Sequence, residues 1–167
     1  MKNQAVKNVV IVGGGYTGFG AAIPLARAGL DVVILERDQI GSGASTRNGG
    51  ITSGNLRLSF DDLIKRFGAE KATAFYREAK AARADLAQFI TSEKIDCDLQ
   101  QCGRLVGALR SESLDSMKHD AERLTKLLDI DATVYDQTSL PDYIDTSRYC
   151  GGMMRDDIGG IHPAKLL

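Results

Sequence analysis

Three glycines in a Gly-x-Gly-x-x-Gly pattern restrict the fold of this chain more than any other feature: Gly13, Gly15 and Gly18. They follow a β-branched run over residues 6–12 that is apolar from Val9 on, after Lys7 and Asn8, which is typical of a strand buried on both faces of a parallel sheet. Residues 16–28 then predict a helix. In such a unit the first glycine allows a tight turn, the second lets a pyrophosphate approach the backbone, and the third allows close helix packing. Because the N–H groups at the helix start face the phosphate charge, the pattern predicts a phosphate cradle.

An acidic residue ends the next predicted strand. This strand is expected over residues 31–36, of which 32–35 are β-branched or aliphatic, and Glu36 lies 18 residues after Gly18. This is near the distance at which an acid binds the ribose hydroxyls of a dinucleotide. An acid here argues against a 2′-phosphate, but Arg37 follows directly, so NADP stays open. NAD and FAD present the same ADP to this site, and the plainer alternative is a simple glycine turn beside a solvated Glu36.

A second glycine-rich segment, residues 41–54, follows this strand. Gly, Ser, Thr and Asn dominate it, so a flexible linker is one interpretation. The other is a backbone-rich surface for the remainder of an extended cofactor, because glycine permits close approach of a ligand.

The run Gly-Ala-Ser-Thr-Arg-Asn-Gly-Gly at residues 43–50, together with residues 9–36, resembles the D-amino-acid oxidase-like FAD-dependent oxidoreductases. The run is most similar to the gamma-glutamylputrescine oxidase branch. Further matches are Gly-Arg-Leu at residues 103–105, the glycine pair at 151–152, and Gly-Gly-Ile-His-Pro at 159–163. The resemblance spans essentially the whole chain; the cradle pattern is generic, whereas the second run is fairly specific.

This resemblance implies FAD bound in an extended form, with roles that the residue types permit. Ser42 and Ser45 would bind pyrophosphate or ribityl oxygens, and Arg47 would place positive charge near the flavin ring, where reduced flavin is negative. Arg47 as a surface charge is the alternative. The implied cofactor-binding residues are Gly13, Gly15, Tyr16, Thr17, Gly18, Glu36, Arg37, Ser42, Ala44, Ser45, Arg47, Asn48, Gly49 and Gly50.

The expected fold class is α/β, with a Rossmann-like FAD-binding domain and the beginning of an inserted α+β substrate domain. We expect residues 1–90 to form the FAD-binding part and residues 91–167 to begin the substrate domain, running into a truncated return toward the FAD domain. The predicted elements within these parts are helices at 60–67, 69–91 and 111–128, strands at 95–99 and 104–109, an extended piece from Val134, and a turn-rich tail at 150–163.

The last residues, 163–167, predict the first turn of a helix, because proline is favoured at the first helical position. A natural domain rarely ends there, so we expect a fragment of a longer protein. We expect the fragment to be inactive alone, because its flavin-ring site is incomplete.

The function implied by the resemblance is oxidation of an amine or amino acid to an imine by hydride transfer to flavin N5. No residue of this chain is assigned a catalytic role, and His162 is either an acid–base group or a turn histidine. The alternatives are an NAD-dependent dehydrogenase with a classical Rossmann domain and a non-catalytic nucleotide-binding module. The electron acceptor, covalent or non-covalent flavin attachment and oligomeric state stay open.

Charge and composition limit the kinds of partner that this chain is expected to bind. The net charge is −1, so neither nucleic acid nor a membrane surface is an expected partner. The apolar run at 9–12 is too short to span a membrane. Cys97, Cys102 and Cys150 form no Cys-x-x-Cys pair, which favours reduced thiols and a cytoplasmic location, and no spacing suggests a metal site. The expected partner is a small-molecule amine or amino acid.

Overall fold

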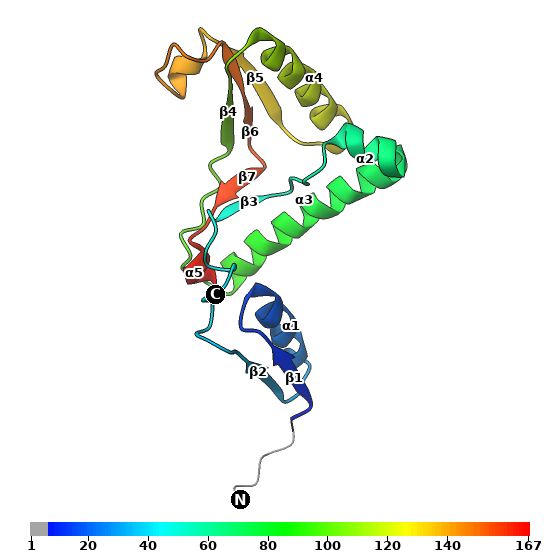
Figure 1. The fold of residues 1–167 in the computed structure, drawn as a ribbon, viewed down its shortest axis with the longest axis vertical. Helices are drawn as coiled ribbons and strands as arrows, with labels where there is room; N and C mark the ends of the chain where they lie inside the picture. The colour runs from blue at the N-terminus through cyan, green and yellow to red at the C-terminus, as the bar shows by residue number, and fades with distance from the viewer. Residues whose placement is uncertain (1–6) are drawn as a thin grey trace, which may run out of the picture. The chain divides into compact units, whose positions relative to one another are not determined.

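The computed structural model describes residues 7–167, which divide into two units (Figure 1). The first contains the chain up to Gly50 together with Ile95–Cys97 and His162–Leu167. The second contains Ile51–Lys94 and Asp98–Ile161. The predicted division after residue 90 separates a part that binds the cofactor from a part that binds the substrate. That division stays a prediction.

The first unit is built on a strand, a helix and a strand, as predicted. β1 (Val9–Val12) and β2 (Val32–Leu35) pair in parallel, and α1 (Tyr16–Arg27) connects them (Figure 1). The N–H of Gly13 continues the ladder by donating to the carbonyl oxygen of Leu35 at 2.8 Å. β-Branched residues fill β1 and all of β2 except Leu35, as expected of a parallel pair, but Val10 and Val12 are exposed, so the expected burial of the first strand on both faces is not found. Val6, at the start of the predicted first strand, lies outside the described residues.

The second unit contains a three-stranded antiparallel sheet. Its order is β4 (Arg104–Ala108), β6 (Gly151–Arg155) and β5 (Ala132–Asp136), with β6 in the centre. The helix α4 (Ser111–Leu128) contacts all three strands (Figure 1). The predicted helix at 111–128 and the strand near 104–109 are therefore confirmed.

The remaining elements of the second unit are a short antiparallel pair and two helices. β3 (Ile51–Ser53) pairs with β7 (Ile158–Gly160), and α2 (Phe60–Phe67) packs against the long α3 (Ala69–Ser92). Ser59 caps α2, because its hydroxyl oxygen accepts the N–H of Asp62 at 3.1 Å. The helices α2, α3 and α4 share one buried apolar core, which consists of Leu63, Ala72, Tyr76, Leu124, Leu128 and Ile130.

Two predictions of local structure were wrong. Residues 95–99 form no strand, because the backbone turns through positive φ at Lys94 and Asp98, at 55° and 53°. The tail at 150–163 was expected to be turns, yet it supplies β6 and β7. Its glycines are required by packing: a Cβ on Gly151 would lie 2.6 Å from both the Leu114 side chain and the Tyr135 carbonyl oxygen.

The chain closes with a short turn of helix, α5 (Pro163–Leu166), and a 3-10 turn, η1 (Leu140–Asp142), precedes β6. Within residues 7–167, no helix combines the length and apolar character needed to cross a membrane.

Candidate dinucleotide-binding site

The three cradle glycines each meet a different geometric requirement. Gly13 has φ of +107°, a conformation that other residues rarely adopt. A Cβ on Gly18 would lie 2.0 Å from the carbonyl oxygen of Gly13, so α1 could not lie this close to the turn with a larger residue. A Cβ on Gly15 would lie 2.7 Å from the hydroxyl oxygen of Ser45. The turn at Gly13 and the close helix packing at Gly18 are those that the sequence pattern predicts, whereas the approach of a pyrophosphate to Gly15 stays a prediction.

The start of α1 is suited to an anion. The first bond of the helix ladder runs from the N–H of Phe19 to the carbonyl oxygen of Gly15, at 3.0 Å. The N–H groups of Thr17 and Gly18 therefore have no acceptor within the helix. No acidic residue lies in the first turn, and Arg27 is basic in the last turn. The first turn of α1 itself therefore supplies no carboxylate that would compensate the positive end of the helix dipole.

Glu36 is held beside the cradle by two backbone groups. Its carboxylate accepts the N–H of Gly14 at 2.7 Å and the N–H of Asp38 at 3.0 Å. The N–H of Asp38 and then that of Gly14 hold the pKa of Glu36 below its usual range. An ionised carboxylate has further lone pairs, so Glu36 can also accept hydroxyl donors. The neighbouring Arg37 is exposed and pairs with Asp38 at 3.0 Å.

The second glycine-rich segment has a defined conformation stabilised by internal hydrogen bonds. The amide of Asn48 donates to the carbonyl oxygens of Ala44, at 3.0 Å, and Ser45, at 2.9 Å. Its own carbonyl oxygen accepts the N–H of Gly50 at 2.8 Å. The hydroxyl of Thr46 donates to the carbonyl oxygen of Gly41. Asn48 thus uses both ends of its amide to shape the segment, a contribution that its sequence position does not reveal.

Two contacts join this segment to the cradle. The hydroxyl oxygen of Ser45 accepts the N–H of Tyr16, the first residue of α1, at 3.0 Å. The N–H of Gly41 donates to the carbonyl oxygen of Gly14 at 3.1 Å. The structure therefore brings Ser45 and Glu36 to the cradle. The predicted site residues that stay exposed are Thr17, Arg37, Ala44, Arg47, Asn48 and Gly49, while Ser42 is half-buried and Gly50 buried.

The segment His162–Leu167, where the sequence predicts a return toward the FAD domain, also contacts the cradle. The hydroxyl of Tyr16 donates to the carbonyl oxygen of Pro163 at 2.7 Å, and burial raises the pKa of this phenol. His162 caps α5, because its Nδ1 accepts the N–H of Lys165 at 3.3 Å. This contact favours the turn-histidine interpretation.

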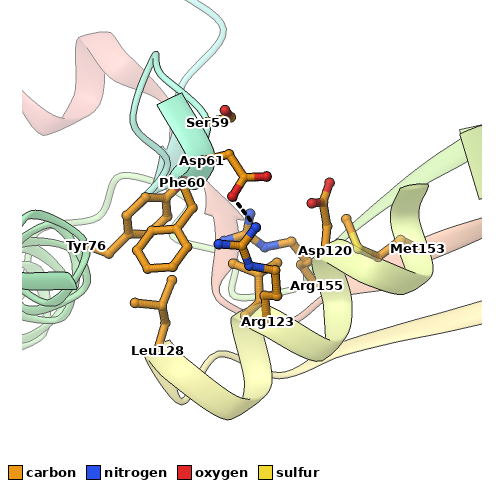
Figure 2. A pocket seen from close by; sticks show the side chains of 10 residues that line it. Ser59, Phe60, Asp61, Tyr76, Asp120, Arg123, Leu128, Met153 and Arg155 are labelled. Atoms are coloured by element: carbon orange, nitrogen blue, oxygen red, sulfur yellow. Dashed lines mark hydrogen bonds and ion pairs between the residues drawn. The ribbon is translucent and has the colours of Figure 1, made fainter. Parts of the chain in front are cut away.

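A cavity of about 160 Å³ in the second unit is lined by apolar and aromatic side chains together with Asp61, Asp120, Arg123 and Arg155 (Figure 2). Arg123 forms an ion pair with Asp61 at its edge. Arg155 is only 8% exposed, and its guanidinium donates to both oxygens of Asp157, at 2.9 and 2.7 Å, and to Asn55 at 2.6 Å. Because the guanidinium groups of Arg123 and Arg155 bind groups of the protein itself, we assign this cavity a structural role rather than a ligand-binding one. In the described part of the chain, no group of three or more metal-ligating side chains is gathered.

Two bacterial relatives match almost the whole chain. Gamma-glutamylputrescine oxidoreductase of Escherichia coli strain K12 is 31% identical over 159 residues, which cover 95% of this chain and 37% of that protein. A probable oxidoreductase, OrdL, of Rhizobium meliloti strain 1021 is 31% identical over 167 residues, which cover 100% of this chain and 39% of that protein. The chain thus spans less than half the length of these relatives.

Solved structures share the fold. Glycine oxidase from Geobacillus kaustophilus matches with a TM-score of 0.73 at 20% identity, covering 96% of this chain and 42% of that chain. L-amino acid deaminase from Proteus vulgaris matches with a TM-score of 0.71 at 20% identity, covering 99% of this chain and 38% of that chain. These likenesses confirm the predicted α/β fold class.

The profile of the DAO family, described as FAD dependent oxidoreductase, matches residues 8–167. This match confirms the predicted family and its cofactor, FAD. The chain belongs to the DAO family of FAD-dependent oxidoreductases.

Proposed function

We propose that the first unit binds the ADP half and the start of the riboflavin half of FAD in an enzyme that oxidises an amine or amino acid. The observation that carries the proposal is the hydrogen bond between Ser45 and Tyr16, which places the second glycine-rich segment at the start of α1. FAD bound in an extended form needs a second backbone-rich segment for its riboflavin half, whereas a classical nicotinamide domain has no need of this glycine-rich run directly after the second strand.

The cradle residues fit a pyrophosphate and a ribose. The N–H groups of Thr17 and Gly18 would donate to phosphate oxygens at the positive end of α1. The carboxylate of Glu36 would accept the ribose hydroxyls through its remaining lone pairs. Ser45 has one hydroxyl proton, and its oxygen already accepts the N–H of Tyr16, so it would donate that proton to a phosphate or ribityl oxygen.

The exposed part of the segment would serve the riboflavin half. Gly49 and Gly50 would allow close approach to the ring, and the guanidinium of Arg47 would lie near it. Asn48 would hold this part of the segment in shape through its amide contacts. The other implied residues, Ser42, Ala44 and Arg37, would lie along the same cofactor.

The reaction class rests on the relatives. FAD when bound accepts a hydride at N5 from the carbon next to the substrate nitrogen. The relatives named above act, by their names, on gamma-glutamylputrescine, on glycine and on L-amino acids. The activity is proposed for the natural-length protein, and we expect none from residues 1–167 alone. A cytoplasmic location, and the division into a cofactor part to residue 90 and a substrate part from 91, belong to this proposal.

The proposal is tested with the purified natural-length protein. We expect an oxidised-flavin band near roughly 450 nm, and binding of FAD but not NAD to the apoprotein. Under anaerobic conditions, an amine or amino acid should bleach this band. Sn-glycerol 3-phosphate is an informative comparison, because several relatives are glycerol-3-phosphate dehydrogenases. A colourless protein that binds NAD would contradict the cofactor assignment, and bleaching by glycerol 3-phosphate alone would contradict the substrate class.

A further inference from the structure

Tyr16 joins the cradle to a segment far along the chain. Its backbone N–H donates to Ser45, and its hydroxyl donates to the carbonyl oxygen of Pro163, 147 positions later. One residue at the start of α1 therefore contacts both the second glycine-rich segment and α5. Because Tyr16 is held both by its backbone N–H and by its hydroxyl, the residue has little freedom to move. The start of α1 is fixed with it.

Leu167 contacts the other half of the site. A Cβ built on Gly41 would lie 2.3 Å from Cδ2 of Leu167, so the leucine packs directly against the glycine backbone. Gly41 has φ of +75°, is buried, and donates its N–H to the carbonyl oxygen of Gly14. The contact therefore lies where the second segment meets the cradle.

The position of α5 is itself fixed. The N–H of His162 donates to the carbonyl oxygen of Cys97 at 2.7 Å, and Cys97 is 1% exposed. The His162 side chain caps the first turn of α5. The carbonyl oxygen of Pro163 and the side chain of Leu167 thus extend from a short helical turn anchored to buried backbone.

We propose that the segment His162–Leu167 acts as a brace that holds the cradle and the second glycine-rich segment in the geometry that FAD requires, with Tyr16 and Leu167 as its positioning residues. The inference rests on the proposed FAD site. A brace formed before the ligand arrives raises affinity, because less ordering is needed on binding. Neither Tyr16 through its hydroxyl nor Leu167 has to touch FAD for this effect.

The first test is Tyr16→Phe in the natural-length protein, which removes one hydroxyl and keeps the ring. We expect FAD to bind about three- to tenfold more weakly, the effect of one net hydrogen bond. The visible circular dichroism of the bound flavin should change, because its surroundings relax. The matched control is Tyr135→Phe in the second unit, which removes a hydroxyl that is hydrogen-bonded to the hydroxyl of Tyr143. This variant should leave FAD affinity unchanged.

The second test uses Gly41→Ala, whose new methyl group would collide with Leu167. We expect a loss of FAD affinity that Leu167→Ala, added to Gly41→Ala, partly restores by removing the collision. If Tyr16→Phe and Leu167→Ala alone both bind FAD with unaltered affinity and dichroism, the brace is wrong and the FAD site stands. If the unaltered protein binds no FAD, both the brace and the proposed function are overturned.

Discussion

The hydroxyl oxygen of Ser45 accepts the backbone N–H of Tyr16 at 3.0 Å, from 29 positions further along the chain. The residue before α1 is Gly15, which has no side chain to cap the helix. Ser45 therefore supplies from a distant segment what a serine or aspartate at the N-cap normally supplies locally. The cap of α1 and the second segment of the proposed cofactor site are therefore linked through the same side chain.

Ser45→Ala should therefore have two effects. Loss of the cap should lower the free energy of unfolding by about 1 kcal/mol. FAD affinity should also fall, because the hydroxyl proton is lost as a donor. Ser59→Ala is the matched control, since it removes the cap of α2 in the second unit. It should lower stability to a similar extent and leave the FAD dissociation constant unchanged; equal FAD affinity in both variants would contradict the role of Ser45.

Gly18→Ala should disrupt the cradle. Its methyl group would lie 2.0 Å from the carbonyl oxygen of Gly13, which is backbone and can move only with the turn. We expect a loss of stability of roughly 1–3 kcal/mol in urea unfolding, together with loss of bound flavin. Gly20→Ala in the same helix meets nothing within 4 Å, so it should raise stability by about 0.5–1 kcal/mol. A flavin content equal to that of the unaltered protein in Gly18→Ala would argue against the cradle.

Glu36→Gln should change the acid limb of the stability profile. The pKa of Glu36 is lowered in the folded protein, so its ionised form is favoured by folding. That contribution is present above the ordinary glutamate pKa and is lost as pH falls through the lowered value. Unfolding midpoints measured between about pH 6 and pH 3 should fall less steeply in Glu36→Gln than in the unaltered protein.

The same variant should bind FAD more weakly at neutral pH, because a neutral amide accepts ribose hydroxyls less strongly than a carboxylate. Asp38→Asn is the control: it removes the exposed pair with Arg37 and keeps the backbone N–H that Glu36 accepts. It should leave FAD affinity unchanged, and an equal weakening in both variants would assign the effect to general charge.

Arg155→Met should destabilise the second unit by on the order of 3–5 kcal/mol, because it leaves the half-buried carboxylate of Asp157 without its partner. The double variant Arg155→Met with Asp157→Leu should recover much of this loss, since it removes both charges. Urea unfolding monitored by far-UV circular dichroism measures both values. A double variant no more stable than the single one would show that Asn55, the third member of the network, carries the larger part.

The sequence allowed the strand–helix–strand unit around Gly13, Gly15 and Gly18 to be predicted, because glycine spacing, β-branched strands and a terminal acid act locally. It could not reveal β6, whose glycines look like turn residues until Leu114 and the Tyr135 backbone are placed against Gly151. It also could not reveal that Ser45 caps α1. Such contacts join residues far apart in sequence, and no local pattern records them.

The assembly of the first unit from segments far apart in sequence has a consequence for the rate of folding. The first unit is assembled from residues up to Gly50, Ile95–Cys97 and His162–Leu167, so the intervening chain must fold or loop out before the unit is complete. Closing so long a loop costs entropy and slows folding, since contacts distant in sequence form late. During synthesis, the strands β1 and β2 emerge long before Pro163, which the hydroxyl of Tyr16 contacts. The first unit is therefore a late product of folding, although β1 and β2 precede the whole second unit in the chain.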